Sequence, residues 1–242
     1  MLGISSFSYS NKTLSEALEV IENKVACAEI FCEGMHDLFK YTEIPLSYNL
    51  KYSVHAPCSD LNIASIRERI RKASIGLVED VAYLCQQIGA EVMVLHPGYF
   101  SYSCDLPAVM KALETSLDEM EYIREETGVL ICLENMPADW NCFVFQNPGM
   151  DLKNHGFTLD IGHANTTNAL NDFLKQPISH LHIHDNNGTS DEHLPVGDGN
   201  IDFNCMRHKL KSNGCMKILE HRTGFDVDKS LETINTKYKY LK

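Results

Sequence analysis

The sequence contains no apolar run approaching the roughly 18 residues that a membrane-spanning helix needs. Its N-terminus has no basic stretch followed by a long apolar one, so we expect neither a membrane span nor a signal peptide. Basic residues are scarce: 21 Lys and Arg stand against 33 Asp and Glu, and the formal net charge is −12. Proteins that bind nucleic acid mainly through phosphate contacts usually carry a basic surface, so this balance weakens a nucleic-acid function.

Two familiar cysteine and glycine patterns are also missing. The nine cysteines form no Cys-x-x-Cys pair, and an odd number without a framework predicts reduced thiols in a cytoplasmic protein. No glycine-rich phosphate-binding motif follows an early strand, which removes support for a nucleotide-binding open sheet. The 242 residues contain no linker or low-complexity tract, so we expect a single domain over residues 1–242.

Eight short apolar runs alternate with helical patterns along the whole chain. They are rich in Val, Ile, Leu and Phe, as strands buried on both faces should be. The expected strands are Leu2–Phe7, Val25–Phe31, Lys51–His55, Glu91–His96, Val129–Glu134, Phe157–Asp160, Ile178–His184 and Met216–Glu220. Two long amphipathic helices are expected over Ile63–Ile88 and Leu106–Glu126. This alternation predicts an α/β fold, a single (β/α)8 TIM barrel, with an open doubly wound sheet as the alternative.

Side chains that can bind metal collect at the carboxyl ends of these strands and in the loops that follow. In a TIM barrel those ends meet at one mouth, where active sites are built. Several carboxylates crowded there would repel one another unless cations lay between them, and imidazole with carboxylate suits zinc, iron or manganese. The candidate ligands are His55, His96, Glu134, Asp160, His163, His182, Asp191, His193 and Glu220. His184 competes with His182, because alternate residues of a strand face the same side.

Several of these residues lie in short motifs. The motifs are His55-Ala-Pro, His96-Pro-Gly, Leu133-Glu-Asn, Asp160-Ile-Gly-His163, His182-Ile-His-Asp185 and Asp191-Glu-His193. Together they resemble the xylose isomerase-like TIM barrels and, within these, the AP endonuclease family 2 branch that includes endonuclease IV. The resemblance is strong from His55 to Glu220 and weaker before His55.

The resemblance implies one of two metal centres. Sugar isomerases and epimerases of this superfamily bind one divalent ion through positions that match Glu134, Asp160, His182 and Glu220. Endonuclease IV holds three zinc ions, which implies that His55 and His96 join Glu134 on a first ion and that the same four positions hold a second. The third ion would be held by His163, Asp191 and His193.

The resemblance also gives expectations for activity. We expect a metal-dependent hydrolase that uses up to three zinc ions, with manganese or iron as other choices, and with Glu134 and Glu220 as catalytic residues. The substrate would be a small phosphoester or damaged DNA, although Cys58 replaces the DNA-contacting tyrosine of endonuclease IV. The alternative is a sugar or sugar-phosphate isomerase or epimerase that uses one metal. No motif specifies an oligomeric state.

Overall fold

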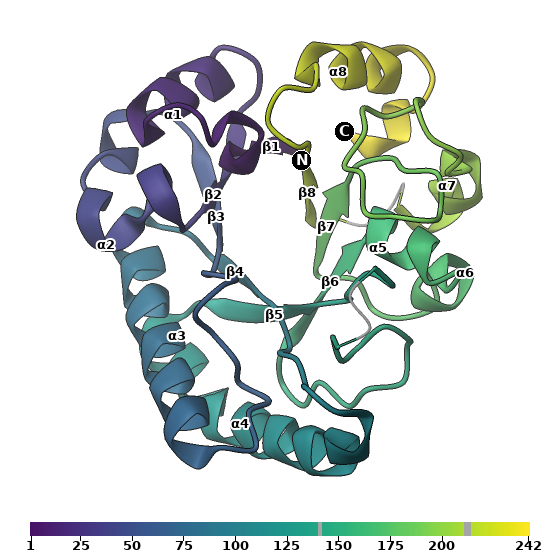
Figure 1. The fold of residues 1–242 in the computed structure, drawn as a ribbon. Coiled ribbons are helices and arrows are strands. Elements are labelled where there is room, and N and C mark those ends of the chain that lie inside the picture. Colours follow the sequence, from purple (N-terminus) through teal and green to yellow (C-terminus); the bar gives the residue numbers. More distant parts are fainter. Residues whose placement is uncertain (140–141, 211–213) are drawn as a thin grey trace.

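Eight parallel strands form a closed barrel in sequence order (Figure 1). The computed structural model describes residues 1–139, 142–210 and 214–242. The strands are β1 (Leu2–Ser5), β2 (Cys27–Phe31), β3 (Lys51–His55), β4 (Val92–Leu95), β5 (Leu130–Glu134), β6 (Gly156–Asp160), β7 (His180–Ile183) and β8 (Met216–Leu219). Strand β1 closes the barrel, because Ile4 pairs with Ala28 on one side and with Leu219 on the other. The TIM-barrel prediction is confirmed, and the open sheet is wrong.

Helices and short 3-10 turns connect the strands and cover the outside of the barrel (Figure 1). The α-helices are α1 (Leu14–Glu22), α2 (Leu38–Tyr41), α3 (Glu68–Ile88), α4 (Leu106–Thr127), α5 (Ile161–Thr166), α6 (Leu170–Phe173), α7 (Arg207–Leu210) and α8 (Val227–Thr236). The 3-10 turns are η1 (Ser6–Tyr9), η2 (Gly34–His36), η3 (Pro45–Ser47), η4 (Ser103–Asp105), η5 (Phe203–Met206) and η6 (Lys239–Leu241). No helix within the described ranges is long and apolar enough to cross a membrane.

Local sequence signals fix where the helices begin and end. Helix α1 starts at a capping box, in which the Thr13 hydroxyl accepts the Glu16 N–H while the Glu16 carboxylate accepts the Thr13 N–H. Helix α3 ends at Gly89, whose φ of 72° is the left-handed conformation that glycine adopts without strain. The buried face of α3 carries Val78, Val81 and Cys85, which belong to the core around the barrel.

Helix α3 starts later than the apolar periodicity predicts. The helix was expected from Ile63, but it begins at Glu68 because Asn62 holds the preceding segment as a loop. The Asn62 Oδ1 accepts N–H groups from Ala64, at 3.1 Å, and from Tyr99, at 3.3 Å. These side-chain bonds compete with helical ones and tie the loop to the segment after β4, beside the barrel mouth.

Candidate metal centre

All nine predicted metal ligands lie at the carboxyl ends of β3 to β8, in the loops that follow or, for His163, in the short helix α5 directly after β6. His55, Glu134 and Asp160 are the last residues of β3, β5 and β6, and His182 lies within β7. Most of the nine are buried, while His96 and Asp191 are partly exposed. Their donor atoms form three neighbouring groups.

The central group contains three carboxylates around one imidazole. His182 Nδ1 lies 2.7 Å from Glu134 Oε1, 3.3 Å from Glu220 Oε2 and 3.8 Å from Asp160 Oδ2. The four donor atoms lie within 4.8 Å of one another. Three carboxylates so close together need positive charge between them, which a divalent cation would supply.

The first group consists of His55, His96 and Cys58 and faces the other oxygen of Glu134. Glu134 Oε2 lies 3.1 Å from His96 Nε2 and 3.3 Å from His55 Nε2. The Sγ of Cys58 is also close, at 3.7 Å from His55 Nδ1 and 3.9 Å from His96 Nε2. Glu134 therefore presents one oxygen to the central group and the other to the first group, which is the position of a bridging carboxylate.

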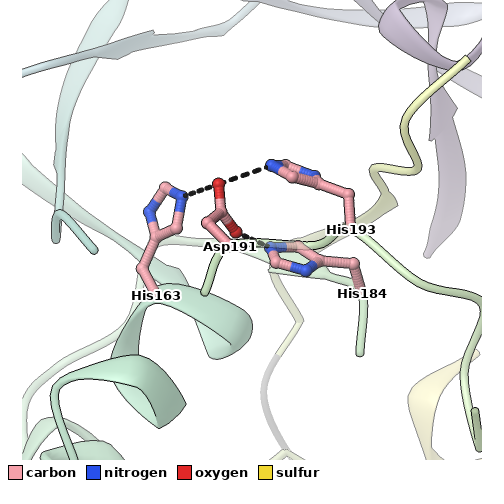
Figure 2. Close-up of side chains that lie close together, drawn as sticks. All are labelled: His163, His184, Asp191 and His193. Carbon is pink, nitrogen blue, oxygen red and sulfur yellow. Dashed lines mark hydrogen bonds and ion pairs between the residues drawn. The ribbon is translucent and has the colours of Figure 1, made fainter. Parts of the chain in front are cut away.

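The third group surrounds Asp191, as Figure 2 shows. Its Oδ2 lies 2.9 Å from His193 Nε2 and 3.3 Å from His163 Nε2, and its Oδ1 lies 3.6 Å from His184 Nε2. Within the described chain, this buried Oδ1 accepts no hydrogen bond. A buried carboxylate oxygen that accepts no hydrogen bond is available to bind a cation.

Hydrogen bonds to backbone carbonyls orient the histidines. The Nδ1–H groups of His55, His163 and His193 donate to the carbonyl oxygens of Ala56, Asn135 and Glu220, each at 2.8 Å. Each bond fixes the tautomer that leaves the Nε2 lone pair free to bind a metal. In the first and third groups this Nε2 faces a carboxylate, and in the central group His182 Nδ1 does so, which suits a divalent ion.

The electrostatics of the mouth follow from this crowding. Burial disfavours a charged imidazole, but Cys58 and Glu134 outweigh it and raise the pKa of His96 to about 9. Against the same opposition from burial, Asp191 raises the pKa of His193 to about 9. Burial also opposes ionisation of Glu134, yet its facing imidazoles hold the pKa of that carboxyl well below its usual range. Without metal, protons on the histidines therefore balance the carboxylates, and a divalent ion would displace them.

Two features of the site were not predicted from the sequence. Glu29 is fully buried in β2, and its oxygens lie 2.8 Å from His180 Nε2 and 2.8 Å from His182 Nε2. The available signal was a lone acidic residue inside an apolar strand. The second feature is that His182 in β7 and His184 just after it belong to different groups. His182 joins the central group, and His184 joins the third group.

A small cavity opens over the first and third groups. Its volume is about 200 Å³, and its lining includes Cys58, Glu220 and the aromatic rings of Phe7, Phe31 and Phe143. Larger hollows lie elsewhere on the surface, such as one beside Lys153 and His155, away from these ligands. Residues of all three donor groups line the smaller cavity, which makes it the candidate substrate pocket.

Residues 46–236 match the family described as xylose isomerase-like TIM barrel. The chain belongs to this family, as its motifs predicted. A curated relative is an uncharacterised protein of Methanocaldococcus jannaschii, 42% identical over 229 residues that cover 90% of this chain and 91% of the relative.

Solved structures with the same fold include several enzymes. A D-tagatose 3-epimerase-like protein superposes with a TM-score of 0.86 at 32% identity, covering 99% of this chain and 96% of the other. The IOLI protein with a bound zinc atom has a TM-score of 0.76 at 21% identity, with 99% and 95% covered. Endonuclease IV from Thermus thermophilus has a TM-score of 0.61 at 16% identity, with 99% and 98% covered. The last two likenesses concern the fold alone.

Proposed function

We propose that this protein is a hydrolase of small phosphoesters that uses a multinuclear metal centre. The observation that carries the proposal is the placement of Glu134 between two groups of donors, with Oε1 2.7 Å from His182 and Oε2 3.1 Å from His96. A one-metal enzyme has no need of the first group around His55 and His96, nor of the third group around Asp191. Imidazole and carboxylate donors favour zinc, and manganese or iron would also suit them.

Each part of the site has a role in this proposal. Divalent ions held there would polarise a phosphoryl oxygen and supply hydroxide near neutral pH. Glu134 holds two of the donor groups at a fixed separation, while Glu220 lines the cavity and can accept a proton from a bound group. The rings of Phe7, Phe31 and Phe143 flank the cavity and limit the access of bulk water to it.

A small substrate agrees better with the surface than duplex DNA does. The cavity holds about 200 Å³, and the chain carries a net charge of −12. Cys58 also stands where the DNA-contacting tyrosine of endonuclease IV is expected. We therefore expect weak binding to undamaged duplex DNA, which falls further as salt rises.

Metal counting combined with a hydrolysis assay tests the proposal. We expect two or three zinc-class ions per chain and cleavage of bis(p-nitrophenyl) phosphate that is lost on chelation. One exchangeable ion without phosphoester cleavage would contradict the proposal. Tight, salt-resistant binding to duplex carrying an abasic site, with cleavage there, would instead make damaged DNA the substrate.

A sugar epimerase is the second candidate, and the 32% identity to a D-tagatose 3-epimerase-like protein favours it. Such a reaction needs carboxylates that move a proton beside a carbonyl, and Glu134 and Glu220 would serve. Against it, Glu134 presents one oxygen to each of two donor groups, an arrangement that a one-metal reaction does not need. Incubation with ketoses in deuterated water separates the two candidates, because only an epimerase exchanges a carbon-bound hydrogen.

A further inference from the structure

We propose that His184 is the fourth ligand of the metal site formed with His163, Asp191 and His193, and that Gly162 makes the room for its ring. This inference rests on the multinuclear centre proposed above and adds a residue to it. The resemblance to endonuclease IV implied three ligands at this place. A fourth ligand would close the site, and closed four-coordinate zinc sites are structural, whereas catalytic ones keep an open position.

The distances around Asp191 fit one four-coordinate ion. Metal–ligand bonds of about 2.0–2.1 Å place the donor atoms of a tetrahedron about 3.3 Å apart. Asp191 Oδ2 lies 2.9 Å from His193 Nε2 and 3.3 Å from His163 Nε2, and Asp191 Oδ1 lies 3.6 Å from His184 Nε2. One donor atom from each of the four residues lies within 4.8 Å of the other three, so a single ion can reach all of them. All three imidazoles direct Nε2 at the carboxylate, from α5, from the residue after β7 and from the loop that follows (Figure 2).

The ring of His184 is held beside that of His193. The two rings are stacked, with centroids 4.0 Å apart and planes 17° apart, and both Nε2 atoms point toward Asp191 (Figure 2). His193 has a φ of 51°, which is unusual for a residue with a side chain. The loop keeps this conformation through two backbone hydrogen bonds between Asp185 and Leu194, at 2.8 and 2.9 Å.

Gly162 is the second part of the argument. A Cβ built on Gly162 would lie 1.9 Å from His184 Cε1, so any larger residue would push the imidazole away. Gly162 precedes His163 directly, and Asp160 caps the same turn by accepting the His163 N–H. One helical turn therefore supplies His163 to the site and leaves the space that His184 occupies.

His184 has a competing role that the experiment must separate. Its Nε2 lies 3.1 Å from both oxygens of Asp160, so the imidazole could simply orient that carboxylate in the central group. As a ligand, His184 would give the Nε2 lone pair to the ion and hold its Nδ1–H near the carbonyl of Asp185, which is 3.5 Å away. If His184 is a ligand, its replacement should release the ion of the third group. If it only orients Asp160, its replacement should instead weaken binding at the central group.

The test compares His184→Gln and Gly162→Ala with the wild type by metal content after a timed challenge with a chelator. Loss of an outer hydrogen-bond partner weakens metal binding about 10- to 100-fold, so loss of a ligand should weaken the third site by at least about 100-fold. We expect both variants to lose one equivalent and keep the rest. Gly76→Ala is the matched control, because a Cβ on Gly76 in α3 meets nothing within 4 Å.

Cobalt substitution gives an independent readout. We expect the strong visible absorption of four-coordinate Co²⁺ to decrease in both variants, while circular dichroism stays unchanged. Full metal retention by His184→Gln, or loss of the central ions instead of one equivalent, would overturn the inference and leave the hydrolase proposal intact. A wild-type protein that binds a single ion would overturn both.

Discussion

Replacing Glu134 by Gln tests the bridging arrangement most directly. The carboxylate is 1% exposed and lies between the first and central groups. A glutamine has the same shape but only one carbonyl oxygen, and its amide NH₂ must face whichever group the oxygen does not. One group therefore loses an oxygen donor, and both lose the negative charge that offsets the repulsion between two cations.

The size of the effect follows from the burial of the pair. Removing one partner of a buried ion pair costs about 3–5 kcal/mol, because the other charge is left uncompensated. At about 1.4 kcal/mol for each factor of ten, this corresponds to a loss of metal affinity of roughly two to three and a half orders of magnitude. We therefore expect Glu134→Gln to lose more than one metal equivalent together with hydrolysis.

The assay is metal content by mass spectrometry after dialysis against a weak chelator, measured beside phosphoester hydrolysis. Glu125→Gln is the control, because it removes the same charge from an exposed position on α4. Full wild-type metal content in Glu134→Gln with activity lost would refute the bridging role. That outcome would favour an isomerase or epimerase, in which Glu134 moves a proton while Asp160, His182 and Glu220 keep one ion bound.

Three other measurements follow from the same geometry. The metal-free protein carries protons on His96 and His193 below their pKa values of about 9. Metal affinity should therefore rise about tenfold per pH unit between pH 7 and 9 for each proton that the metal displaces. Calorimetry in buffers of different ionisation enthalpy should count those protons, and an affinity that does not change with pH would contradict this assignment. Although burial favours the thiol, His96 and His55 lower the pKa of Cys58 to about 7. The rate at which iodoacetamide alkylates Cys58 in the metal-free protein, followed by peptide mapping, should therefore level off above about pH 8 rather than still rise at pH 9. Glu29→Gln should weaken metal binding at the central group by about 10- to 100-fold without unfolding the barrel, because Glu29 orients His182, and unchanged affinity in a metal titration would refute that role.

The barrel and the place of its site were predictable because both depend on local patterns. Each strand is marked by a short apolar run, and closure brings every carboxyl end to one mouth whatever the exact strand limits are. The expected strand Glu91–His96 is Val92–Leu95 in the structure, yet His96 still follows its end. Residues placed by strand ends are therefore found from the sequence even when boundaries shift by one or two residues.

Glu29 and His184 escaped prediction because their roles depend on distant partners. Glu29 meets His180, which is 151 residues away, only after β2 and β7 face each other inside the barrel. Alternation along the expected strand Ile178–His184 predicted that His182 and His184 share a face but not which donors each would meet. That depends on the loop that returns Asp191 and His193 to the mouth, and on the space left by Gly162.

The three donor groups are joined to one another through strand ends rather than through loops alone. Glu134 links the first and central groups, while Asp160 links the central and third groups through its contacts with His184 and with the His163 N–H. Glu220 also links the central and third groups, because its carboxylate faces His182 and its backbone carbonyl oxygen accepts a hydrogen bond from His193. The strand ends thus set the spacing of the first and central groups and tie the third group, whose Asp191 and His193 come from a loop, to them. A substitution at any of these linking residues should therefore disturb two groups together, whereas a change at His184 should disturb the third alone if that imidazole is a ligand there.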